Sequence, residues 1–299
     1  MNFQTEEGLA SYKEKVYYNS QVFKSLFGGS PSDFATKVIW PAGPNLEQMK
    51  FISDKYAVPL NYVKGINLAD ECINMQSAPQ LQAYLNPSFG CTTVTKDNII
   101  GQTLDLFDLE LCIIRDHDSL YVTMPPYLCL LGMGPKLAMC TNHLFDKVDY
   151  LAGTPISQIR RQVLRFSTLD EAVHYLLNVK PTTAVNLMLT DGTATVNVEL
   201  TPKGAIVFEA GPGKADSVFA HTNHVIKSFQ DDKSCSRLNT ARDLLLNFGK
   251  SVPEVLDAPG VVQPLANGFG TIVSVWIDMK EKILAYRDPQ EKTYRQLRL

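Results

Sequence analysis

The sequence lacks the patterns typical of a membrane-spanning, secreted or nucleic-acid-binding protein. It has no apolar run of 18 residues, and its first stretch, "MNFQTEEGLASYKEKVYY", has no apolar signal core. Basic residues form no long stripe: "IRRQVLRF" and "RQLRL" are short, and the formal net charge is −3. We therefore expect neither a membrane nor a nucleic acid as a partner.

The cysteines lack the spacing of a metal site or a disulfide framework. No CxxC pair occurs, and three of the six lie in apolar segments ("ELCII", "YLCLL", "LAMCT"), where a reduced cysteine behaves as a small apolar residue. The pattern predicts a reducing cytoplasm and no metal or other cofactor. The six are Cys72, Cys91, Cys112, Cys129, Cys140 and Cys235.

What is present is an ordinary globular composition in two differently patterned parts. The 299 residues are 45% hydrophobic and 20% charged, and no repeat or long linker divides them. Apolar spacing in the first 90 residues predicts helices over 4–26, 45–58 and 67–78, with Asn45 as an N-cap. This part is therefore expected to be mostly helical.

From residue 91 the apolar period changes to two, and turn residues follow at short intervals. Helices are predicted at 154–166, at 167–179 with Ser167 or Thr168 as the cap, and at 236–248. Many antiparallel strands with few helices predict an α+β fold of two stacked sheets with helices outside. The expected strands are 91–95, 98–105, 109–115, 119–124, 127–132, 137–142, 184–190, 193–200, 204–209, 217–222, 270–278 and 281–287.

Cys91 stands where the two parts meet, in "PSFGCTTVTKD". It could be an ordinary buried thiol, or the Gly90–Cys91 bond could be cut to make Cys91 a new N-terminus. The freed α-amino group, with an ordinary pKa of about 7.7–8.0, would then be a base fixed beside the thiol. Gly90 suits this step because it has no Cβ to block attack on its carbonyl.

A conventional cysteine hydrolase would take its base from histidine instead. His117, in a turn, and His174, on a helix, are expected at the surface. The remaining histidines lie in "TNHLF" and "AHTNHV", and no local pattern selects one as the partner of Cys91: they are His143, His221 and His224. The residues alone leave both mechanisms open.

The segment "FGCTTVTKDNIIGQTLDLFD" resembles the nucleophile segment of the N-terminal-nucleophile (Ntn) amidohydrolases. It is most similar to the isopenicillin-N/aminopenicillanate acyltransferase branch, and less so to choloylglycine hydrolase, penicillin V acylase and acid ceramidase. The resemblance implies a four-layer αββα sandwich with a helical N-terminal pro-segment. It also implies that Cys91 begins the mature chain and that Asp105 binds the freed amino group.

The resemblance continues in the same order over most of residues 60–290. "YLCLLGMGPKLAMCTNHL" implies that Asn142 lies on the substrate side, "VFAHTNHV" that Asn223 is the oxyanion-hole amide, and "CSRLNTARDLL" that Arg237 is a site arginine. Two positions depart from it. Gln102 replaces the arginine of choloylglycine hydrolases, which argues against bile-salt hydrolysis, and Leu104 replaces an aromatic residue of the acyltransferase branch, which predicts a reshaped pocket.

These observations predict an enzyme that first cuts its own chain. Residues 1–90 would be its α chain and 91–299 its β chain, in one compact unit. The mature enzyme would cleave a linear, non-peptide amide of a small molecule through an acyl-thioester on Cys91. The alternatives are an acyltransferase that passes the acyl group to an amine, and an unprocessed, non-catalytic family member. The oligomeric state stays open, a homo-oligomer included.

Overall fold

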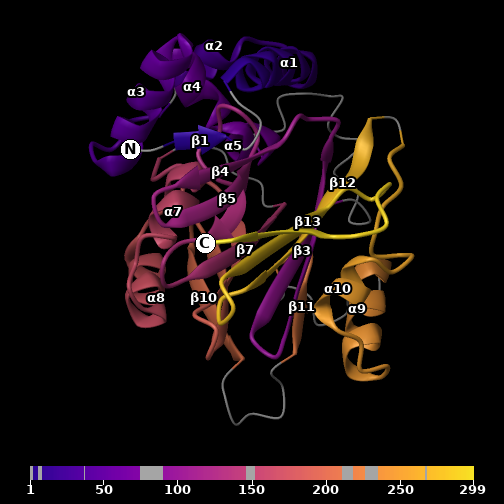
Figure 1. Cartoon of the computed structure of the whole chain (residues 1–299). Helices are drawn as coiled ribbons and strands as arrows, with labels where there is room; N and C mark the ends of the chain where they lie inside the picture. Colours follow the sequence, from indigo (N-terminus) through magenta and orange to yellow (C-terminus); the bar gives the residue numbers. More distant parts are fainter. Residues whose placement is uncertain are drawn as a thin grey trace.

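The computed structural model describes residues 3–5, 9–36, 38–74, 90–145, 152–210, 218–225, 235–266 and 268–299. Its strands form two antiparallel sheets that stack face to face, with helices on their outer sides (Figure 1). Separate apolar clusters fill the space between the sheets and the space beneath each helical layer. The predicted α+β fold, a four-layer αββα sandwich, is confirmed.

The larger sheet has eight strands, and the helices α7 (Ile156–Val163) and α8 (Leu169–Asn178) pack on its outer face. Thr168 is the N-cap of α8, as predicted, because its side chain accepts a hydrogen bond from the Glu171 amide. In spatial order the strands of this larger sheet are β1 (Phe3–Thr5), β4 (Cys112–Asp116), β5 (Ser119–Thr123), β6 (Leu131–Met133), β7 (Ala138–His143), β8 (Val185–Thr190), β9 (Thr195–Thr201) and β10 (Gly204–Ala210).

The smaller sheet has six strands and carries α9 (Ser236–Leu246) and α10 (Val252–Leu256) on its outer face. Its central pair, β3 and β12, contains a bulge between Thr271 and Val273, which locally breaks the regular alternation of β12. In spatial order the strands are β11 (Phe219–His221), β2 (Thr92–Lys96), β3 (Ile99–Phe107), β12 (Phe269–Asp278), β13 (Ile283–Arg287) and β14 (Arg295–Arg298).

The helices before residue 91 cover one end of the sandwich (Figure 1). None of the helices in the described part of the chain is long and apolar enough to cross a membrane. The helices before residue 91 are α1 (Leu9–Phe27), α2 (Pro31–Ala35), α3 (Pro44–Tyr56), α4 (Leu60–Ile66) and α5 (Ala69–Asn74).

Three local predictions for this part were wrong. Residues 3–5 form a strand paired with β4 rather than the start of a helix. Asn45 is not an N-cap, because its side-chain amide donates to the Gln158 carbonyl at 2.9 Å and Gly43 precedes the helix instead. The helix expected over 67–78 begins two residues later, because Asn67 is the C-cap of the preceding helix, α4. Residues 75–78 lie outside the described residues.

The strand expected at 127–132 is also shorter than predicted. The Tyr127 amide donates to the Met124 carbonyl and its carbonyl accepts from Thr123, so residues 124–127 turn instead of extending. Only Leu131–Met133 pair as β6. The turn sends the Tyr127 side chain towards α5, where it hydrogen-bonds to Asp70.

Candidate active site

Cys91 immediately precedes β2 and belongs to the apolar cluster between the two sheets. Its side chain is buried, and its Sγ lies 3.9 Å from the Asp105 carbonyl oxygen. Burial, followed by the charge of Asp105, raises the pKa of the Cys91 thiol to about 11. In the intact chain the thiol is therefore neutral and needs a base before it can react.

Gly90 has a backbone that only glycine tolerates easily. Its φ is 120°, and a Cβ built on it would lie 2.2 Å from Oδ1 of Asn223. The carboxamide of Asn223 thus packs directly against the residue whose carbonyl precedes Cys91.

Asp105, on β3, is a buried carboxylate with an incomplete set of partners. Its Oδ1 accepts a hydrogen bond from Thr271 Oγ1 at 2.6 Å. Its Oδ2 accepts none from the described residues and lies 3.8 Å from Nη1 of Arg237. Burial raises the pKa of Asp105 to about 7, and the opposing effects of Arg237 and Thr271 are too weak to prevent this.

Arg237, in the first turn of α9, connects the parts of the site. It is 1% exposed, and Nη1 donates to the Cys91 carbonyl at 3.1 Å and to Thr92 Oγ1 at 3.0 Å. Its Nη2 donates to Asn223 Oδ1 at 3.3 Å. The planar guanidinium fixes the relative positions of the nucleophile strand and the Asn223 amide.

Two asparagines flank Cys91 from different directions. Asn223 Nδ2 donates to the His143 carbonyl at 2.8 Å and Asn223 lines the cavity described below. Asn142 lies behind Cys91: its Nδ2 donates to the Cys91 carbonyl at 3.0 Å, and its Oδ1 accepts from Thr93 at 2.7 Å. Asn142 is thus not in the cavity wall, and the geometry favours a supporting position over the predicted substrate contact.

The two departures from the family pattern lie beside this site. Gln102 exchanges hydrogen bonds with the backbone of Thr141 and so joins β3 to β7 behind Cys91. Leu104 is a buried part of the apolar core between the sheets. Both positions are therefore filled by residues that hold the sheets together.

No histidine of the described chain hydrogen-bonds to the Cys91 thiol. His117 and His174 are exposed, as expected. His221 is fully buried, with Nε2 2.8 Å from Glu199 Oε1 and Nδ1 2.6 Å from the Thr222 carbonyl. His224 lies beside Thr222, and the ring of His143 contacts Asp70 and Asn74, so neither of these rings is hydrogen-bonded to the thiol.

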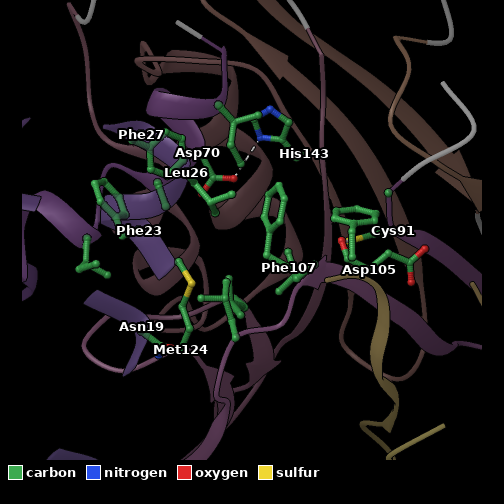
Figure 2. A pocket seen from close by; sticks show the side chains of 18 of the residues that line it. Asn19, Phe23, Leu26, Phe27, Asp70, Cys91, Asp105, Phe107, Met124 and His143 are labelled. Carbon is green, nitrogen blue, oxygen red and sulfur yellow. Dashed lines mark hydrogen bonds and ion pairs between the residues drawn. The ribbon is translucent and has the colours of Figure 1, made fainter. Parts of the chain in front are cut away.

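A cavity of about 120 Å³ opens beside Cys91 (Figure 2). Of the apolar stretch "MPPYLCLLGMG", Met124 and Leu130 line the cavity, while Leu128 belongs to the core. The sequence did not reveal the wall contributed by the first 90 residues, because an apolar helical stripe looks the same facing a core or a cavity. That wall comprises Asn19, Phe23, Leu26, Phe27, Ile66, Ala69, Asp70 and Ile73.

The two stacked sheets with outer helices form the fold of the Ntn hydrolases. A mutant conjugated bile acid hydrolase from Clostridium perfringens matches it with TM-score 0.51 and 14% identity, over 71% of this chain and 92% of that chain. Penicillin V acylase from Agrobacterium tumefaciens aligns with TM-score 0.47 and 15% identity, over 70% and 86% of the two chains. A Caenorhabditis elegans orthologue of N-acylethanolamine-hydrolyzing acid amidase aligns with TM-score 0.47 and 18% identity, over 63% and 93%.

The sequence itself narrows the class to a family. Residues 128–284 match the family described as acyl-coenzyme A:6-aminopenicillanic acid acyl-transferase, and the chain belongs to that family. A search of the curated proteins gives no match.

Proposed function

We propose that this protein is a self-processing cysteine amidohydrolase. It cuts its own Gly90–Cys91 bond and then hydrolyses a linear, non-peptide amide of a small molecule through an acyl-thioester on Cys91. Residues 1–90 and 91–299 become two chains that stay together. Catalysis uses Cys91, Asp105, Asn223 and Arg237, with Asn142 holding the Cys91 backbone.

The single observation that carries this proposal is the incomplete environment of Asp105. A buried carboxylate whose Oδ2 has no hydrogen bond within the described residues is costly unless a positive donor joins it. Cleavage before Cys91 creates such a donor, the α-ammonium group, at the adjacent residue. The same group supplies the base that the described histidines do not.

The first reaction is an attack by Cys91 on its own chain. The thiol adds to the Gly90 carbonyl, and the amide nitrogen of Cys91 leaves with the thiol proton. A thioester between Gly90 and the Cys91 sulfur results, together with a free α-amino group. Water then hydrolyses the thioester to the Gly90 carboxylate and the free thiol. The Asn223 amide, packed against Gly90, is well located to stabilise the oxyanion.

The second reaction repeats this chemistry on a substrate. The α-amino group takes the thiol proton as the sulfur adds to the substrate carbonyl. One Asn223 N–H is held by the His143 carbonyl, which leaves the second to donate to the developing oxyanion. The substrate amine leaves with the proton of the α-ammonium group, and water hydrolyses the acyl-thioester. Arg237 holds the Cys91 carbonyl and Asn223 in register throughout.

Intact-mass spectrometry of the purified protein tests the self-cleavage. We expect two fragments that meet between Gly90 and Cys91, and a single uncut chain for Cys91→Ala. Both fragments should elute together in size-exclusion chromatography. A wild-type protein that stays whole after long incubation, yet hydrolyses amides, would show that the N-terminal amine is not the base.

The cavity supports an apolar acyl group as the part of the substrate nearest Cys91. Its wall is apolar apart from the thiol and a few polar side chains, and α1 supplies one side of it. Burying apolar surface there stabilises the complex by roughly 25 cal/mol per Å². Because α1 precedes Gly90, the pocket needs residues from both sides of the cut.

Leu26→Glu tests this use of α1. An ionised carboxylate in the cavity wall should raise the KM for apolar acyl amides by about 10-fold or more, because an apolar chain cannot pair it. Self-cleavage should persist. Tyr17→Glu is the matched control, since Tyr17 lies on the same helix but is 70% exposed. Equal KM values for the two variants in steady-state assays would place the acyl group elsewhere.

Membership of an acyltransferase family favours one alternative, in which an amine rather than water takes the acyl group. Both reactions use the same thioester and the same residues. An assay that separates release of free acid from formation of a new amide, in the presence of an added amine, distinguishes them.

A further inference from the structure

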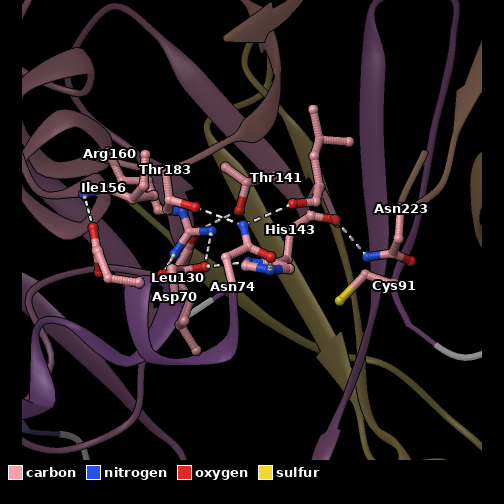
Figure 3. A network of polar contacts seen from close by, with 12 residues as sticks. Asp70, Asn74, Cys91, Leu130, Thr141, His143, Ile156, Arg160, Thr183 and Asn223 are labelled. Atoms are coloured by element: carbon pink, nitrogen blue, oxygen red, sulfur yellow. Dashed lines mark hydrogen bonds and ion pairs between the residues drawn. The ribbon is translucent and has the colours of Figure 1, made fainter. Parts of the chain in front are cut away.

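The cavity is also lined by a histidine that the proposed mechanism does not use, and each of its two ring nitrogens faces a side-chain oxygen. His143, at the end of β7, has Nδ1 3.2 Å from Asp70 Oδ1 and Nε2 3.0 Å from Asn74 Oδ1 (Figure 3). A neutral imidazole has only one N–H and would leave one of these contacts as a repulsion between lone pairs. The protonation of the ring therefore depends on whether either neighbour can donate.

Asp70 acts as an acceptor only. Arg160 donates to both of its oxygens, at 2.8 and 3.1 Å, and Tyr127 donates to Oδ2 at 2.5 Å. Burial acts to raise the pKa of Asp70, but Arg160, His143 and Tyr127 outweigh it and hold that pKa below its usual range. Asp70 is thus ionised and has no proton to give to His143.

The orientation of Asn74 is fixed by a different neighbour. Its other amide atom lies 3.0 Å from the Leu144 carbonyl, which can only accept, so that atom is the NH₂ nitrogen. The nitrogen also lies 2.5 Å from Thr183 Oγ1. The amide oxygen therefore faces His143, and both ring nitrogens of His143 must donate.

We propose that His143 is a fixed cation of the cavity, held doubly protonated by Asp70 and Asn74, whose charge stabilises the oxyanion formed when Cys91 attacks an amide. The inference rests on the proposed function. Both holding residues precede the Gly90–Cys91 bond, so the first segment contributes to the chemistry after the chain is cut. Arg160 pairs with Asp70 through both carboxylate oxygens, so the Asp70 charge is shared between Arg160 and His143.

The position of the ring suits this role. His143 lines the same cavity as Cys91, its side chain is only 11% exposed, and its own carbonyl holds the Asn223 amide. A charge acts more strongly in such an enclosed apolar space than in water. His143 thus joins a cluster on one side of the cavity to the oxyanion-hole amide on the other.

Ionisable side chains from three elements lie around the ring of His143. Asp70 and Glu71 come from α5, Arg160 from α7, and Tyr127 from the turn before β6. Burial and the charge of Asp70 raise the pKa of Glu71 to about 7. Cys91 and Asp105 line the same cavity. The α-amine base must be neutral, which gives the acidic limb of kcat.

Nitrogen NMR on the full chain with ¹⁵N-labelled histidine tests the charge directly. We expect both His143 nitrogens to show protonated shifts at pH 7, with the resonance assigned by its loss in His143→Gln. A neutral tautomer, with one unprotonated nitrogen, overturns the proposal. This measurement does not require an active enzyme, so it separates the charge of His143 from the proposed function.

Kinetics of His143→Gln test the use of the charge. We expect kcat to fall about 10-fold with little change in KM, because glutamine donates hydrogen bonds but carries no charge. His174→Gln, an exposed position on α8, should match wild type. An unchanged kcat profile in His143→Gln, beside an active wild type, would mean that the cluster only supports the fold. An inactive wild type would count against the proposed function instead.

Discussion

Replacing Gly90 by alanine is expected to stop self-cleavage and, with it, all amide hydrolysis. The added Cβ would lie 2.2 Å from Oδ1 of Asn223, and the φ of 120° is one that a residue with a side chain rarely adopts. The backbone would have to move, which displaces the carbonyl that Cys91 must attack. A misplacement of about 1 Å at a reacting atom costs on the order of 100-fold in rate. Intact-mass spectrometry should show one uncut chain.

Gly204→Ala separates the contact from the backbone strain. Gly204 has a φ of 138°, close to that of Gly90, but a Cβ there would meet nothing within 4 Å. This control should be cut at the wild-type rate, although it is somewhat less stable. Cleavage of Gly90→Ala at a rate close to that of Gly204→Ala would show that the Asn223 contact does not set the geometry of the reaction.

The parts of the molecule that short-range patterns determine could be predicted from the sequence. The change of apolar period at residue 91 predicted two stacked sheets. The resemblance to the Ntn amidohydrolases implied that Cys91, Asp105, Asn223 and Arg237 belong to one site. The structure brings these four side chains into one cluster. Their catalytic roles remain a proposal.

Other features depend on contacts between distant segments and left no local signal. Asn45 has the residue type of an N-cap, yet its side-chain amide donates a hydrogen bond to the carbonyl of Gln158 on α7, 113 residues away. Asp70 and Asn74 resemble ordinary helix-surface residues, but they surround His143. The resemblance implied that Asn142 lies on the substrate side, and this stays a prediction; its hydrogen bonds to the Cys91 carbonyl and to Thr93 depend on how distant strands pack and left no local signal.

Asp105 is a buried carboxylate whose Oδ2 has no hydrogen bond within the described residues, and burial raises its pKa. In the proposed mechanism the α-ammonium group released by the cut is its missing partner. We expect Asp105→Asn to abolish hydrolysis, because a neutral amide cannot pair with the α-ammonium group of Cys91. An amidase assay on the purified variant checks this, and activity within 10-fold of wild type would contradict it.

The same substitution should stabilise the uncut protein, and the effect should depend on pH. Burial raises the pKa of Asp105 to about 7, above its ordinary value of 3.8. Its contribution to stability is therefore complete below about pH 4 and is lost as the pH rises towards 7. In a Cys91→Ala background, which prevents cleavage, Asp105→Asn removes this loss. The gain in the free energy of unfolding should grow between pH 4 and 8 by roughly 2–4 kcal/mol, measured by urea unfolding. Parallel stability curves for the two proteins would show that Asp105 is already fully paired in the intact chain. They would contradict the proposal that Asp105 needs the α-ammonium group as a partner.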